Sequence, residues 1–140
     1  MPVRTESRNK KTRTLVDPQP VLNLLQGWKS AGAETVLIER VGGLPGQSAA
    51  RGFAFGEGCG VIRACAEIAE LRVMFVEPAT WRAKLGVRAE VHPDEKDSKA
   101  ASRRVALREF PNAEAIFRRK KDDGLWEAAL LALYAERFLT

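Results

Sequence analysis

Four carboxylates stand at positions where apolar surroundings would make an unpaired charge costly. Glu39 ends an apolar run, while Asp122, Asp123 and Glu127 lie at the start of an apolar helical pattern. Residues four apart on a helix share one face, so Asp123 and Glu127 would project the same way. Glu127, inside Leu-Trp-Glu-Ala-Ala-Leu-Leu-Ala, must therefore either be paired or bind a metal ion.

Carboxylates that meet from a strand end and a helix are hard oxygen ligands, which suit Mg²⁺ or Mn²⁺. Two such ions, about 3.5–4 Å apart, would activate a water and stabilise the leaving oxygen in phosphodiester cleavage. Structural roles are the alternative. Glu39 would then pair with Arg40 or a nearby lysine at a strand edge, and the two aspartates would complement a helix dipole. The residues alone leave both interpretations open.

The charge balance favours a polyanionic partner. The chain has 23 Lys and Arg against 18 Asp and Glu, a net charge of +5, as is typical of proteins that bind nucleic acid. No apolar run approaches the roughly 18 residues of a membrane helix, and the polar N-terminus lacks the apolar stretch of a signal peptide. We expect a cytosolic protein with no small-molecule cofactor, in which Cys59 and Cys65 form no mutual disulfide.

The elements that must position the carboxylates can be read from the spacing of apolar residues. Asp17-Pro18 begins a predicted helix that Gly32 ends, and apolar runs predict buried strands at 35–40 and 72–76. Helices are predicted at 47–70, 96–110 and 122–138, the last of them buried on several sides, with a short helical segment at 80–85 before Gly86. The glycines of segment 47–70 suggest close packing. The pattern is that of an α/β domain with a parallel strand pair.

Five segments, in the same order along the chain, resemble one family. Val-Leu-Ile-Glu-Arg-Val, Gly-Leu-Pro-Gly-Gln-Ser (43–48) and Gly-Phe-Ala-Phe-Gly-Glu (52–57) resemble the strand, loop and helix of phage and bacterial RuvC-like Holliday-junction resolvases. Segment 76–87 is similar to that family's Pro-x-x-Trp-x-x-x-Leu-Gly motif, and 120–132 to its last catalytic helix. The resemblance covers residues 17–138 and implies a ribonuclease H-like fold, with a mixed sheet flanked by helices.

The resemblance also implies roles for particular residues. Glu39 matches the family's second catalytic carboxylate, while Asp123 and Glu127 match the pair on its last helix, with Asp122 as a rival for the first of these places. These four would be the catalytic residues and would hold two Mg²⁺ or Mn²⁺ ions. The implied partner is branched DNA, bound in a salt-sensitive manner by a homodimer. The DNA-facing residues would be Gln47, Arg51, Lys99, Arg103, Arg118, Arg119, Lys120 and Lys121.

One departure concerns the start of the family's fold. The family opens with a strand carrying Ile-Asp-Pro-Gly, whereas Val16-Asp17-Pro18 has no glycine after it and no apolar strand pattern before it. Residues 1–16 resemble the end of the third strand and the basic turn after it, with the nuclease domain at 17–140. We therefore expect the first strands to be missing and the strand at 35–40 to have an unpaired edge. The alternatives to an active resolvase are an inert nucleic-acid-binding form of the fold and a ribonuclease H-like nuclease with another substrate.

Overall fold

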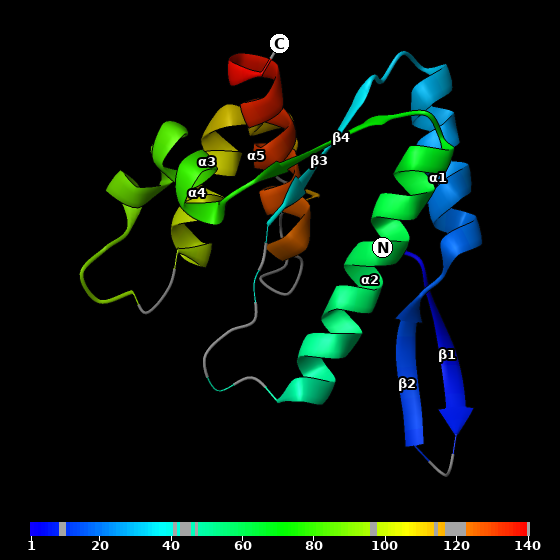
Figure 1. Ribbon diagram of the computed structural model, residues 1–140. Coiled ribbons are helices and arrows are strands. Elements are labelled where there is room, and N and C mark those ends of the chain that lie inside the picture. Colours follow the sequence, from blue (N-terminus) through cyan, green and yellow to red (C-terminus); the bar gives the residue numbers. More distant parts are fainter. Residues whose placement is uncertain are drawn as a thin grey trace. The chain divides into compact units, whose positions relative to one another are not determined.

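The computed structural model describes residues 1–8, 11–40, 42, 46, 48–95, 98–113, 115–116 and 123–139, and it shows a mixed α/β protein (Figure 1). The chain divides into two compact units. The first comprises Met1–Ile38 and Gly42–Met74, and the second comprises Glu39–Val41 and Phe75–Thr140. Each unit has its own set of helices and its own buried residues.

The first unit begins with an antiparallel hairpin. Strand β1 (Val3–Arg8) pairs with β2 (Lys11–Val16) in a register that runs from Val3↔Val16 to Arg8↔Lys11. The sequence did not lead us to expect this hairpin, because its strands are polar and lack an apolar face. Strand β2 ends at Val16, directly before Asp17. The sequence led us to expect no buried strand there, and Leu15 and Val16 are indeed only half-buried.

Two helices form the core of the first unit. Helix α1 (Pro18–Ser30) begins after Asp17, as predicted, and the chain turns away at Gly32 with φ +97°. Helix α2 (Ala49–Ile68) begins with the Ser48 side chain accepting a hydrogen bond from the Arg51 backbone N–H. The two helices lie side by side (Figure 1). Their buried residues pack together with Ala69 and Leu71, namely Val21, Leu25, Cys65 and Ala66.

The sequence led us to expect close packing at the glycines of α2, and the structure shows it at Gly58. A Cβ added to Gly58 would lie 3.2 Å from Val16 Cγ2, so the absence of a side chain lets α2 approach β2. Gly52, Gly56 and Gly60 have no described atom within 4 Å of such a Cβ. At these three positions the structure gives no packing reason for glycine.

Strands β3 (Thr35–Glu39) and β4 (Arg72–Val76) form the predicted parallel pair, connected through α2. The Arg72 N–H donates to the Glu34 carbonyl at the start, and the Arg40 N–H donates to the Val76 carbonyl at the end, so the strands run in the same direction. The expectation of fully buried strands was wrong. Residues 36–39 are only half-buried and Phe75 is 41% exposed, because in the described part of the chain this sheet has two strands and limited cover.

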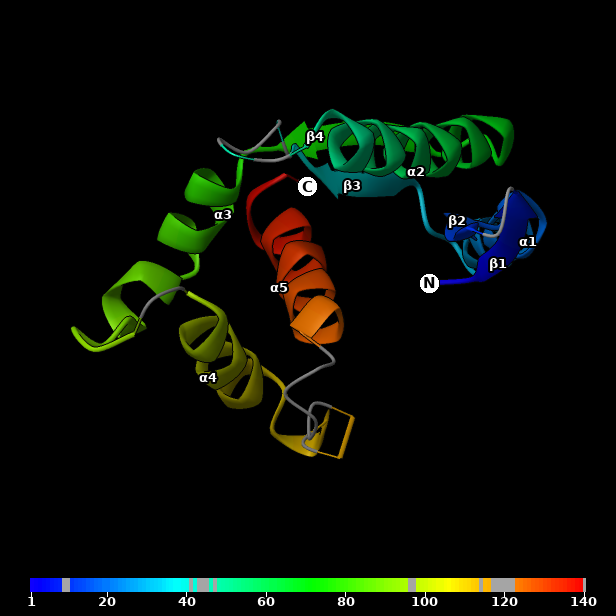
Figure 2. The ribbon, with the colours of Figure 1, turned by 90° about the horizontal axis from the view of Figure 1, so that it is seen from below.

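The second unit is helical and contains the end of β3. It is made of α3 (Pro78–Lys84), the 3₁₀ turn η1 (Val87–Glu90), α4 (Lys99–Glu109), the 3₁₀ turn η2 (Pro111–Ala113) and α5 (Asp123–Phe138). Helix α4 packs against α5 and η1, and α3 packs against η1 and α5 (Figure 2). Its largest fully buried apolar side chains are Trp81, Val87, Val105 and Leu130.

Helix α5 is less buried than its sequence predicted. Trp126 and Leu130 are buried, but Leu125 is 50% exposed and Phe138 is 45% exposed. The expectation that α5 is covered on several sides was therefore wrong, because its neighbours α3 and α4 leave part of its apolar surface uncovered. An apolar pattern all round a helix does not by itself ensure burial.

Both cysteines are free thiols, as predicted. Burial raises the pKa of the Cys59 thiol, and the Cys65 Sγ donates to the Pro18 carbonyl at 3.5 Å. Among the described helices, none is both long enough and apolar enough to cross a bilayer.

Candidate functional site

Glu39 ends β3, and its carboxylate accepts a hydrogen bond from the indole of a tryptophan in α3. Trp81, fully buried in α3, donates its Nε1–H to Glu39 Oε1 at 2.8 Å. The N–H of a buried tryptophan usually finds an acceptor, and here the acceptor is a carboxylate. The Glu39 side chain, still 23% exposed, is therefore oriented without being sealed from solvent.

Arg82, the next residue of α3, lies between Glu39 and a second carboxylate. Its Nη2 is 3.0 Å from Glu127 Oε1 and 3.6 Å from Glu39 Oε1. The three side chains, which come from β3, α3 and α5, are each 21–24% exposed. We call Glu39 and Glu127, together with Arg82 between them, the acidic site.

The guanidinium of Arg82 is only partly satisfied in the acidic site. Its Cζ lies 4.9 Å from the Trp81 ring centroid, which is close enough for a cation–π contact. Its Nε is buried and has no hydrogen-bond partner among the described residues. One nitrogen thus makes both described contacts with the carboxylates, while another buried donor is left unused.

The structure brings together two of the four carboxylates that the sequence singled out. Glu39 and Glu127 meet at Arg82. Asp123 is the first residue of α5, but the structure does not describe its side chain. Asp122 lies outside the described residues. The choice between the two aspartates, and the catalytic role of all four residues, stay predictions.

The residues expected to face DNA are only partly described. Arg51 is exposed in the first turn of α2, Lys99 is exposed in the first turn of α4, and Arg103 is half-buried on α4. The remaining predicted positions, Gln47, Arg118, Arg119, Lys120 and Lys121, lie outside the described residues. Two further arginines of α4 form ion pairs within the second unit, since Arg104 contacts Glu95 and Arg108 contacts Glu90.

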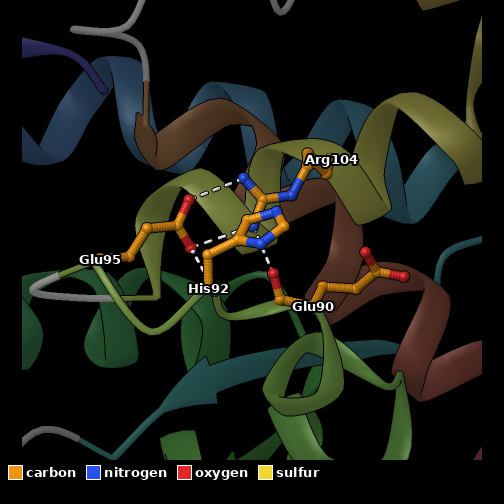
Figure 3. A network of polar contacts seen from close by, with 4 residues as sticks. All are labelled: Glu90, His92, Glu95 and Arg104. Atoms are coloured by element: carbon orange, nitrogen blue, oxygen red, sulfur yellow. Dashed lines mark hydrogen bonds and ion pairs between the residues drawn. The ribbon is translucent and has the colours of Figure 1, made fainter.

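A second cluster of arginine and glutamate joins α4 to the segment before it, and we call it the α4 clamp (Figure 3). Arg104 donates to both carboxylate oxygens of Glu95, at 2.7 and 3.0 Å, and to the Glu90 carbonyl. The His92 backbone N–H donates to Glu95 at 3.0 Å. These contacts lower the pKa of Glu95 to about 2. The hydrogen bonds from Arg104 are the larger cause, and the one from the His92 backbone N–H is the second.

The acidic site suits a hard divalent cation such as Mg²⁺ or Mn²⁺ better than a softer ion such as Zn²⁺. Among the described residues, no three or more His, Cys, Asp or Glu side chains are grouped as metal ligands. Mg²⁺, however, is commonly held by one or two carboxylates, with waters and substrate phosphates completing its shell. Glu39 and Glu127 therefore fit such an ion as two of its ligands, provided that the Arg82 side chain moves away from them.

Trp81 and Arg82 are the members of this site that reasoning from the sequence missed. Both lie in the segment Pro-Ala-Thr-Trp-Arg-Ala-Lys-Leu-Gly, which drew attention only through its resemblance to a motif. For Trp81 a usable signal was present in the sequence. The N–H of a buried tryptophan usually finds an acceptor, and Glu39 ends one strand of the predicted parallel pair.

In comparisons with known proteins, no family model matches the chain, and no curated protein matches it either. The class that can be stated is therefore that of the fold: a mixed α/β protein whose strand end and helices bring two carboxylates together around an arginine.

Proposed function

We propose that this chain is a Mg²⁺-dependent DNA endonuclease of the RuvC-like type, with a ribonuclease H-like fold, and that it cleaves four-way junctions as a two-fold dimer. The observation that carries the proposal is the approach of Glu39 and Glu127 to a single nitrogen of Arg82. Two carboxylates from distant parts of the sequence are gathered in a partly exposed site, as metal-assisted phosphodiester cleavage requires.

In this mechanism Glu39 and Glu127 would hold the ion. A divalent cation bound there would supply a water of lowered pKa and a positive charge for the leaving oxygen. Trp81 fixes the orientation of Glu39 by donating its Nε1–H. Trp81 is fully buried, whereas the Glu39 and Glu127 side chains are 23% and 21% exposed and so remain accessible to solvent. Exposed basic residues such as Arg51 and Lys99 contribute sequence-independent attraction to phosphates.

The test is nicking of a synthetic four-way junction in Mg²⁺ by the full chain and by two variants, Glu39→Gln and Glu127→Gln. Each substitution keeps the size of the side chain and removes a charged ligand. We expect each to lower the nicking rate by about 100-fold or more, since losing an outer-shell partner alone typically costs about 10–100-fold. Glu67→Gln, on the exposed surface of α2, is the matched control and should leave the rate unchanged.

Substrate choice tests the rest of the proposal. A preference for the four-way junction over a linear duplex and an RNA:DNA hybrid supports the resolvase, whereas a preference for the hybrid would assign the fold a different nuclease activity. Nicking that is equal in wild type and in Glu39→Gln would remove the acidic site from the mechanism.

A second candidate function is DNA binding without cleavage. The position of Arg82 favours it, because a guanidinium already contacts both carboxylates that an ion would need. Salt-sensitive binding to the junction, without nicking in either Mg²⁺ or Mn²⁺, would identify this inert form.

A further inference from the structure

We infer that Arg82 is a displaceable counter-cation, which occupies Glu39 and Glu127 in the metal-free protein and competes with the divalent ion for them. The inference rests on the proposed metal-dependent function and adds a regulatory element to it. Arg82 then sets the concentration of metal ion at which the acidic site fills, instead of serving as a permanent structural pair.

The first support is the geometry of the two contacts. One nitrogen of Arg82 serves both carboxylates, at 3.0 Å to Glu127 and 3.6 Å to Glu39. The longer distance exceeds that of a good charge-assisted hydrogen bond, about 2.7–2.9 Å. Arg82 therefore donates one hydrogen bond, to Glu127, and is attracted to Glu39 by charge alone.

The second support is the incomplete satisfaction of the guanidinium. Its buried Nε has no partner among the described residues, and a buried donor without a partner opposes the conformation that buries it. The Arg82 side chain is nevertheless 24% exposed, so it has a route to solvent. The Nε of Arg104 in the α4 clamp also lacks a described partner, so the two arginines differ in their terminal nitrogens. Arg104 uses two of them for one carboxylate, whereas Arg82 uses one for two carboxylates.

The third support is the charge of the cluster. Glu39 and Glu127 carry two formal negative charges, and the Arg82 side chain between them carries one positive charge. A divalent cation in its place would neutralise both. The hydrogen bond from Trp81 would keep Glu39 oriented while Arg82 leaves, so that displacement of the arginine does not dismantle the site.

The experiment measures Mn²⁺ binding to the full chain by isothermal titration calorimetry, with the paramagnetic resonance of free Mn²⁺ as a second readout. The variants are Arg82→Gln and Arg82→Met, of which the second keeps the apolar stem against Trp81 in case the first folds poorly. Arg108→Gln is the matched control, because it removes one positive charge from an ion pair elsewhere in the same unit. All titrations use one ionic strength, since added salt screens exposed charges.

If Arg82 competes with the ion, both Arg82 variants should bind Mn²⁺ about tenfold more tightly than wild type, which corresponds to about 1.4 kcal/mol. Arg108→Gln should bind like wild type. Unchanged or weaker Mn²⁺ binding by the Arg82 variants would overturn the inference, because weaker binding would mean that Arg82 assembles the ligands.

A further substitution separates this inference from the proposed function. Adding Glu39→Gln to Arg82→Met should abolish the gain in affinity. If wild type and the Arg82 variants bind Mn²⁺ equally and Glu39→Gln weakens that binding, the metal site stands and the competition is refuted. If Glu39→Gln changes Mn²⁺ binding in no background, both the proposed metal site and the inference fail.

Discussion

The acidic site and the α4 clamp are built from the same residue types in different geometries. In the α4 clamp, Arg104 makes a two-nitrogen, two-oxygen contact with Glu95 and also donates to the Glu90 carbonyl. In the acidic site, one nitrogen of Arg82 is shared between two carboxylates. The first arrangement places two donor nitrogens of one arginine in good hydrogen bonds, whereas the second leaves two carboxylates competing for one cation.

This difference separates structural from chemical use of the same pair of residue types. A bidentate contact fixes both side chains and adds specificity of geometry. A shared single nitrogen fixes neither carboxylate fully, and it leaves negative charge available to another cation. We therefore expect substitutions in the α4 clamp to act on stability and substitutions in the acidic site to act on metal binding.

The largest effect should come from Trp81, which supports the acidic site from the core. Trp81→Ala removes a fully buried aromatic side chain and should cost about 3–5 kcal/mol of unfolding free energy. Trp81→Phe keeps most of the volume and loses the donor to Glu39, so it should cost less. Urea unfolding measures both. An alanine variant as stable as wild type would show that this core does not hold the site.

An arginine substitution in each cluster tests the comparison directly. Arg104→Met leaves Glu95 and the Glu90 carbonyl without their shared donor, so it should lower the melting temperature and leave Mn²⁺ affinity unchanged. Arg82→Met should lower the melting temperature less and change Mn²⁺ affinity. Thermal unfolding followed by circular dichroism measures the melting temperatures, and calorimetry measures the Mn²⁺ affinities. Equal changes in both quantities for the two variants would contradict the comparison.

A smaller effect is expected from pH. The pKa of Glu95 is about 2 in the folded protein, against an ordinary value of 4.5, so the ionised carboxylate stabilises the fold above about pH 4.5. That stabilisation is lost as the pH falls from 4.5 through 2. The difference in melting temperature between wild type and Glu95→Gln should shrink over this range. A difference that is constant with pH would show that the Glu95 charge contributes nothing.

Local sequence signals predicted most of the fold. Asp17-Pro18 and Gly32 bound α1, and Gly86, with φ +74°, follows α3 as expected. The hairpin of β1 and β2 escaped prediction because pairing between polar strands leaves no apolar alternation to detect. The half-burial of β3 and β4 was also not predicted. An apolar run indicates which side chains a strand could bury, but not which neighbouring elements cover them.

The candidate site was predictable in its carboxylates and unpredictable in its cation. Glu39 and Glu127 were singled out because apolar surroundings make a charge costly, and the structure places both beside Arg82. Arg82 itself was indistinguishable from the other arginines of a basic chain. Its position between two carboxylates depends on how α3 and α5 pack, and that is a tertiary property with no local signal.

The parallel connection of β3 to β4 has a consequence for the order of folding. The hairpin of β1 and β2 joins neighbours in the sequence, and such hairpins form in about 1–10 μs. The parallel pair can close only after the whole of α2 has been bridged, and contacts between distant residues slow folding. Most members of the α4 clamp lie close together in sequence, whereas Glu39 must wait for a long loop to close before it meets Arg82 and Glu127. We therefore expect the α4 clamp to form early in folding and the acidic site to form late.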